Sequence, residues 1–158
     1  MPTERPLGYS LEAMQIRTQN GKQYVLCAWR RKYVRLTPEE HVRQSILHSL
    51  ETQFEYPHGL IGVEVPIEVA GLKKRCDAIV YDLHMQPLIL IEFKAETVPL
   101  TQQVFDQAAI YNRHLKVPYL MLSNGKDTIV AEILTTEYRF LNYIPNYSNL
   151  EKRGEITL

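Results

Sequence analysis

The stretch Leu88-Ile89-Leu90-Ile91-Glu92-Phe93-Lys94-Ala95 places a glutamate and a lysine two positions apart in an otherwise apolar run. We interpret Pro87–Lys94 as a β-strand and Arg75–Tyr81, upstream of it, as another. Only the short link Asp82–Gln86 separates them. The sequence therefore predicts that the two strands pair as an antiparallel hairpin.

Pairing in this hairpin gathers charged side chains. If the hairpin is centred between His84 and Met85, Asp77 lies directly opposite Glu92 on the same face of the sheet, ~5 Å away. Lys94 follows Glu92 by two positions and points to that face as well. The intervening apolar side chains point the other way, into a core: Ile89, Ile91 and Phe93. Two carboxylates and a lysine thus converge on a mostly apolar sheet.

This combination has a specific chemical use. Adjacent carboxylates repel and raise each other's pKa unless a cation intervenes. Mg²⁺ suits them, because it binds one or two carboxylates and keeps several waters for substrate phosphate oxygens. Lys94 can then orient or deprotonate the attacking water and stabilise charge on phosphorus. The alternative is an ordinary salt bridge from Lys94 to Glu92 or Asp77 on a solvated sheet face.

The hairpin is preceded by a helix with a clear start. Thr37 is a good N-cap, Pro38 occupies the first helical position, and Glu40 completes a capping box. Apolar residues at helical spacing continue to about Phe54. A period-two pattern follows and predicts a strand with one apolar face, made of Ile61, Val63, Val65, Ile67 and Val69.

The remaining pattern adds a second helix, Thr101–Leu115, and two strands, Tyr119–Leu122 and Thr128–Leu134. Near the N-terminus, Asn20-Gly21 between two alternating runs predicts a type I′ hairpin. We therefore expect an α/β fold with a central mixed β-sheet flanked by helices. The expected division is an N-terminal β-hairpin extension (1–36), a core (37–137) and a C-terminal tail (138–158) that packs on it.

Composition limits the classes of function. The 158 residues suit one domain, and 18 basic against 18 acidic side chains exclude a generic polycation, although not a local basic groove. No apolar run is long enough for a membrane span, and the first residues lack a secretion signal. Cys27 and Cys76 fit two buried thiols in a reduced compartment, so we expect a cytoplasmic protein.

Two basic clusters bear on the substrate. The first comprises Arg30, Arg31, Lys32 and Arg35, and the second comprises Lys73, Lys74 and Arg75. Because the second cluster leads directly into Asp77, we expect it to bind phosphate groups of a substrate. Surface charge that serves only solubility is the alternative.

These motifs together resemble a known family. The chain from about Lys32 to Ile133 is similar to PD-(D/E)xK nucleases, and most of all to a stand-alone version of the N-terminal nuclease domain of type I restriction enzyme R subunits. The resemblance rests on four segments, which are residues 31–40, 71–77, 88–95 and 104–112. The last contains Gln107 and Tyr111, which match the QxxxY motif of RecB-like nucleases.

The resemblance implies roles for individual residues. Asp77 and Glu92 would bind the metal together with the Phe93 backbone carbonyl, and Lys94 would act on the attacking water. Gln107 and Tyr111, four positions apart on one helical face, would contact a phosphate or base; simple packing of the tyrosine is the alternative. Glu40 matches an acidic residue that some members supply as a supporting ligand, although its capping role explains it too.

We therefore expect a restriction-endonuclease-like fold and a DNA endonuclease that uses Mg²⁺, with Mn²⁺ as a substitute. The alternatives are a catalytically silent module that binds DNA or a partner subunit, and a phosphoesterase acting on RNA or nucleotides. The sequence contains no ATP-binding GxxxxGK[ST] loop and no evident sequence-reading module. The expected partners are accordingly DNA, a specificity or motor subunit, and a second copy in a homodimer.

Overall fold

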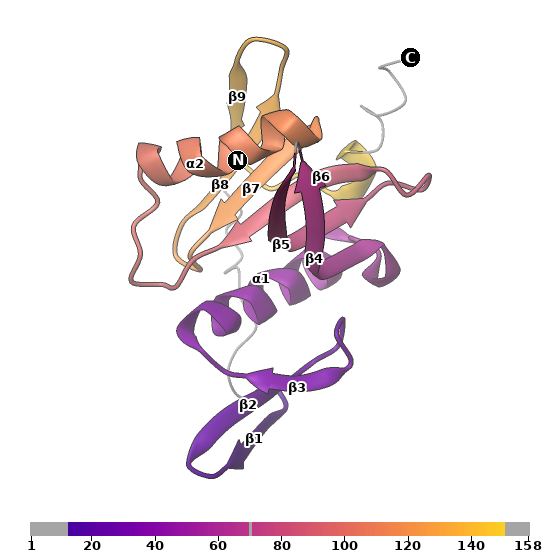
Figure 1. Cartoon of the computed structure of the whole chain (residues 1–158). Helices are drawn as coiled ribbons and strands as arrows, with labels where there is room; N and C mark the ends of the chain where they lie inside the picture. The colour runs from indigo at the N-terminus through magenta and orange to yellow at the C-terminus, as the bar shows by residue number, and fades with distance from the viewer. Residues whose placement is uncertain (1–12, 70, 151–158) are drawn as a thin grey trace.

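The computed structural model describes residues 13–69 and 71–150. This part of the chain contains two sheets, two longer α-helices, a 3₁₀ turn at His58–Leu60 and a helical segment at residues 147–150 (Figure 1). In chain order the elements are β1 (Ile16–Gln19), β2 (Lys22–Cys27), β3 (Lys32–Arg35), α1 (Pro38–Phe54), β4 (Ile61–Val69), β5 (Leu72–Tyr81), β6 (Pro87–Phe93), α2 (Gln102–Leu115), β7 (Tyr119–Ser123), β8 (Thr128–Ile133) and β9 (Tyr138–Leu141).

Both sheets follow chain order. The first three strands form an antiparallel sheet, and the other six form a second sheet in which β6 and β7 run parallel while all other neighbours are antiparallel. A parallel pair needs a crossover connection, and α2 supplies it. The expectation of a central mixed sheet flanked by helices is confirmed.

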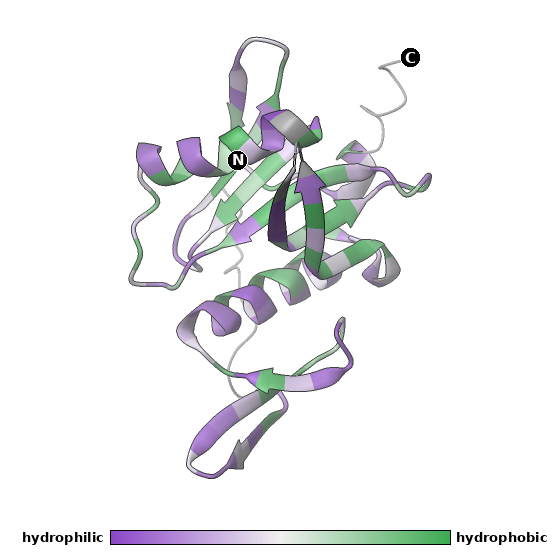
Figure 2. Ribbon diagram, in the orientation of Figure 1, coloured by the Kyte–Doolittle hydropathy of each residue, from purple (hydrophilic) through white to green (hydrophobic). Residues whose placement is uncertain are grey.

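The two helices cover opposite faces of the six-stranded sheet, because alternate side chains of β6 pack against each of them. Ile89 and Ile91 share a buried cluster with Ile46 of α1, whereas Leu90 shares another with Phe105 of α2. Figure 2 shows the strands between the helices largely in green, as expected for a sheet buried on both faces. This arrangement leaves the charged site residues at the end of β6.

The N-terminal sheet packs beneath α1 (Figure 1). Its first turn is the predicted type I′ turn, since Asn20 and Gly21 both have positive φ, 52° and 75°. β3 extends the hairpin to three strands, which the sequence pattern did not predict. Trp29 packs partly on the α1-side core, with its ring 5.1 Å from that of His48. The sheet is thereby fixed against the helix.

The prediction that β4 has a single apolar face is wrong. Ile61 and Val63 pack in the α1-side cluster, but Val65 and Ile67 pack in the α2-side cluster. The change occurs at Glu64, which has left-handed backbone geometry with φ 57° inside the strand. One such residue breaks the period-two alternation, so the strand shows opposite faces to the core before and after it.

The register predicted for β5 and β6 is confirmed, with Ala78 opposite Ile91. A bulge between Val80 and Tyr81 shifts the pairing by one residue, but only toward the turn. The register beside Asp77 is unaffected for that reason.

Beyond Leu134 the sequence pattern assigned no element. The structure places β9 at the edge of the six-stranded sheet, paired with β8. The chain then returns to the α1-side cluster through Ile144, Tyr147 and Leu150, and the Tyr56 hydroxyl donates a hydrogen bond to the Pro145 carbonyl at 3.0 Å. No helix within residues 13–69 and 71–150 is long and apolar enough to cross a membrane.

We expect Ile91→Ala to lower the free energy of unfolding by about 3 kcal/mol, because Ile91 is fully buried and truncation leaves a cavity between sheet and α1. Urea denaturation followed by fluorescence of the single tryptophan measures this loss. Ile110→Ala is the control, because Ile110 on α2 is 57% exposed and its loss should change stability by less than about 0.5 kcal/mol. Equal effects of the two changes would contradict the assigned core.

Candidate active site

Asp77 lies where the β5–β6 pairing ends, and a backbone amide of β6 holds its carboxylate. Phe93 N–H donates to Asp77 Oδ2 at 2.8 Å. The preceding residue on β6, Glu92, is 9% exposed. Burial raises the pKa of the Glu92 carboxyl, and the neighbouring Asp77 carboxylate raises it further. The structure therefore brings together the two predicted acidic residues.

Lys74 enters the same site from β5. Its Nζ lies 2.8 Å from Glu92 Oε1, and this ammonium opposes the rise of the Glu92 pKa. The same Nζ lies 3.8 Å from the centre of the Tyr111 ring on α2, a cation–π contact. The sequence grouped Lys74 with Lys73 and Arg75 as phosphate contacts, and the structure places Lys74 between the sheet and α2.

A cavity of about 120 Å³ opens between the end of β6 and α2. Its lining includes Glu92, Lys94, Gln107 and Tyr111, together with Lys74. Gln107 is exposed and Tyr111 is half-buried, so the QxxxY pair faces a solvent-accessible space. The predicted acid, lysine and QxxxY side chains thus share one cavity.

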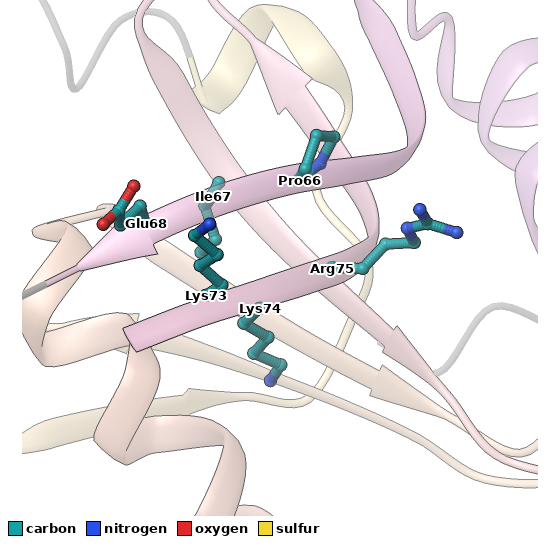
Figure 3. Close-up of a pocket in the computed structure, with 6 residues that line it drawn as sticks. All are labelled: Pro66, Ile67, Glu68, Lys73, Lys74 and Arg75. Atoms are coloured by element: carbon teal, nitrogen blue, oxygen red, sulfur yellow. The ribbon is translucent and has the colours of Figure 1, made fainter. Parts of the chain in front are cut away.

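The other two members of the second basic cluster lie outside this cavity. Figure 3 shows Lys73 and Lys74 leaving β5 on opposite sides of the strand. Lys73 and Arg75 line a separate concavity of about 430 Å³ along the β4–β5 hairpin, to which Lys74 also contributes. Arg75 NH1 lies 3.7 Å from Glu64 Oε2, with its side chain 69% exposed.

Glu40 is engaged elsewhere. The Thr37 hydroxyl accepts from Glu40 N–H at 3.0 Å, but Thr37 N–H donates to Arg35 O, so only half of the predicted capping box forms. The buried Glu40 carboxylate instead accepts from Arg30 at 2.6 Å and from Gln44 at 3.0 Å. Its oxygens are bound by groups of the N-terminal sheet and α1.

Glu39, the preceding residue of α1, is the glutamate of this helix whose pKa is affected by the charges of the site. Burial raises the pKa of its carboxyl, and the Asp77 carboxylate raises it further, while Arg43 and Lys94 oppose the rise. Its side chain is 46% exposed and therefore remains accessible from solvent. The first turn of α1 contributes a third carboxylate to the electrostatics of the site.

Arg43 connects α1 to β4 and to β5, the strand that carries Asp77. Its guanidinium donates to Glu64 Oε1 at 2.5 Å and to the Asp77 carbonyl at 3.2 Å, with a side chain only 6% exposed. Arg43 Nε also lies 3.5 Å from Glu40 Oε1. Arg43 therefore holds Glu64, the left-handed residue of β4, against Asp77 of β5.

The carboxylates of Asp77 and Glu92 can be assessed as ligands for a divalent cation. Among the described residues no group of three or more His, Cys, Asp or Glu side chains is arranged to hold a metal ion. Two neighbouring carboxylates, with a raised pKa on Glu92, fit a hard cation that relieves their repulsion and keeps most of its waters. Asp77 and Glu92 thus match Mg²⁺ better than an ion that needs a complete protein cage.

Sequence reasoning missed Glu39, Arg43 and the inward position of Lys74. Arg43 had a usable signal: it stands four positions before Leu47, on the apolar side of the helix, where a charged side chain requires a partner. Glu39 had no such signal, since its neighbour Glu40 fits the same pattern.

We expect Arg43→Met to lower the free energy of unfolding by about 3 kcal/mol, because it leaves buried acceptors without their cation. Arg75→Met removes an exposed partner of the same Glu64 and should cost less than about 1 kcal/mol. Urea denaturation of both variants measures the difference. Similar losses in the two variants would show that Arg43 does not hold the strands.

No curated protein matches this sequence. A solved fragment of a protein assigned as an HsdR subunit of a type I restriction enzyme from Vibrio vulnificus YJ016 superposes with a TM-score of 0.58 at 20% identity. The overlap covers 75% of this chain and 25% of that one, so this chain spans about a quarter of its length and shares its fold. The family model of the type I restriction enzyme R protein N terminus (HSDR_N) matches residues 38–145, well over half of the sequence. The chain therefore belongs to this family of R protein N-termini.

Proposed function

We propose that this chain is a Mg²⁺-dependent DNA endonuclease of the PD-(D/E)xK kind, with Asp77, Glu92 and Lys94 as its catalytic residues. The observation that carries the proposal is the buried Glu92 carboxylate at the end of β6, which lines one cavity with Lys94 while the adjacent Phe93 N–H holds the Asp77 carboxylate. The family of R protein N-termini is consistent with this activity.

Asp77 and Glu92 would hold the cation, with the Phe93 carbonyl as a further ligand. The bound cation would neutralise charge on the scissile phosphate and act as a Lewis acid. The Phe93 N–H keeps Asp77 Oδ2 in place, which fixes one carboxylate before substrate arrives. Mn²⁺ should substitute, because it accepts the same oxygen ligands.

Lys94 would orient the attacking water and take up its proton as the water oxygen bonds to phosphorus. The bond from phosphorus to the 3′ oxygen breaks as the new bond forms, and the departing oxygen takes a proton from solvent water, which leaves a 5′-phosphate and a 3′-hydroxyl. Gln107 and Tyr111 line the same cavity and would contact the phosphate or a neighbouring base. Lys74 would contribute its positive charge, since its ammonium lies next to Glu92.

The supporting acidic ligand from α1 is better assigned to Glu39 than to Glu40. The Glu40 carboxylate is already bound by Arg30 and Gln44, whereas Glu39 is exposed and electrostatically coupled to Asp77.

The choice of cleavage site would depend on partners. R proteins belong to multi-subunit restriction enzymes, so a specificity or motor subunit and DNA are the partners that we propose. A homodimer that cuts both strands is compatible with the single site on each chain.

We expect Asp77→Asn and Lys94→Met each to lower the rate of Mg²⁺-dependent plasmid cleavage at least about a hundredfold, or about 3 kcal/mol of transition-state stabilisation. Chelation with EDTA should stop cleavage by the wild-type chain. Asp106→Asn and Lys126→Met are matched controls on exposed positions and should cleave normally. Wild-type rates in either site variant would show that the site is assigned wrongly.

Substitutions of Glu39 and Glu40, the two neighbouring glutamates of α1, should affect different properties of the protein. Glu39→Gln is expected to raise the Mg²⁺ concentration for half-maximal cleavage about tenfold, with little change in stability. Glu40→Gln should lower the free energy of unfolding by about 2 kcal/mol, through its weaker pairing with Arg30, and leave the metal requirement unchanged. Metal titrations of cleavage and urea denaturation distinguish the two. The reverse pattern would restore Glu40 as the ligand.

A further inference from the structure

The N-terminal sheet has a one-sided charge. Residues 13–36 contain six basic side chains and no aspartate or glutamate, which leaves 12 basic against 18 acidic residues in the rest of the chain. The six are Arg17, Lys22, Arg30, Arg31, Lys32 and Arg35. The formal charge of zero therefore hides a positive sheet attached to a negative core.

Register assigns the side chains of this sheet to two faces. Val25 is fully buried, and its partners across the sheet are Ile16 and Val34. Cys27, two positions on and on the same face, contacts Gln44 of α1, so this face is turned to the helix. Neighbouring positions on each strand must point away from α1, since side chains alternate. Arg17, Tyr24 and Arg35 form one such row across all three strands.

The outer face combines cations with aromatic rings. Tyr33 lies two positions before Arg35, on the same face of β3, and pairs with Leu26 of β2. The Arg17 guanidinium lies 4.2 Å from the centre of the Tyr33 ring. This contact confirms that residues of the two outer strands share a face. Among the described residues, no acidic side chain pairs with Arg17, Lys22 or Arg35. Exposed cations beside aromatic rings are typical of surfaces that bind nucleic-acid backbones.

The sheet is also held in a fixed position relative to the site. Only Leu36 and Thr37 separate β3 from α1, whose first turn carries Glu39. The Arg30–Glu40 ion pair at 2.6 Å ties the β2–β3 turn to the same helical turn. The outer face therefore keeps a constant orientation relative to α1 and to the sheet that carries the catalytic site.

We propose that the outer face of the N-terminal sheet, formed by Arg17, Lys22, Tyr24, Tyr33 and Arg35, binds the phosphate backbone of DNA outside the catalytic cavity. The inference rests on the proposed function for the identity of the polymer. Its charge is complementary to DNA, whereas the rest of the chain carries more acidic than basic side chains.

The test measures binding apart from cleavage. Fluorescence anisotropy in EDTA, with a fluorescein-labelled 30-base-pair duplex and its single strand as probes, compares Arg17→Glu/Arg35→Glu with Lys116→Glu/Lys126→Glu. The second pair changes charge equally at exposed positions away from the sheet. We expect at least a tenfold loss of affinity in the sheet variant, and a plot of log affinity against log salt that is flatter by about two. The control variant should lose less than about threefold.

Circular dichroism checks that each variant folds, and the milder Arg17→Gln/Arg35→Gln variant repeats the test if charge reversal prevents folding. Loss of binding to the duplex, the single strand or both supports the proposal. Equal affinity and salt dependence in the sheet and control variants would overturn it, as would a wild-type chain that binds neither probe. Cleavage by Asp77→Asn, measured separately in Mg²⁺, tests the proposed function on its own. If that variant still cleaves, the proposed function fails while the binding result stands independently.

Discussion

The buried guanidinium of Arg43 is the contact on which the rest of the site depends. It reaches from α1 to the Glu64 carboxylate on β4 and to the Asp77 carbonyl on β5. A buried cation is tolerated only when its donors are paired, so these acceptors and Arg43 require one another. The left-handed conformation of Glu64 is held in this way, at the position across from Asp77 where the two strands change faces.

The change of faces explains why Lys74 enters the site. Beyond Glu64 and Asp77, the hairpin packs Val65 and Cys76 on the α2 side of the sheet. Lys74, two positions before Cys76, then lies on the α2 side, where it meets Glu92. A regular strand would keep one apolar face along its length and would not deliver this ammonium to the carboxylate.

The structure has two regions of opposite charge, and the two would interact with a polyanion in different ways. Around Asp77 and Glu92, crowded carboxylates create a need for a cation, partly met by Lys74. In the N-terminal sheet, positive charge stands without acidic neighbours in sequence, as required for a surface that attracts phosphate groups. The first turn of α1 joins the two regions, because Glu40 is bound to Arg30 while the Asp77 carboxylate raises the pKa of Glu39.

Local sequence determined the start of α1, the type I′ turn and the pairing of β5 with β6, because caps, turn residues and short links act within a few positions. The pairing of β5 with β6 by itself places Asp77 near Glu92. Only the tertiary structure distinguishes the surroundings of Glu39 from those of Glu40, since both occupy the first helical turn and differ in which groups lie across from them. It also decided the inward position of Lys74, because the left-handed residue of β4 is stabilised by a contact from a distant helix rather than by its own neighbours.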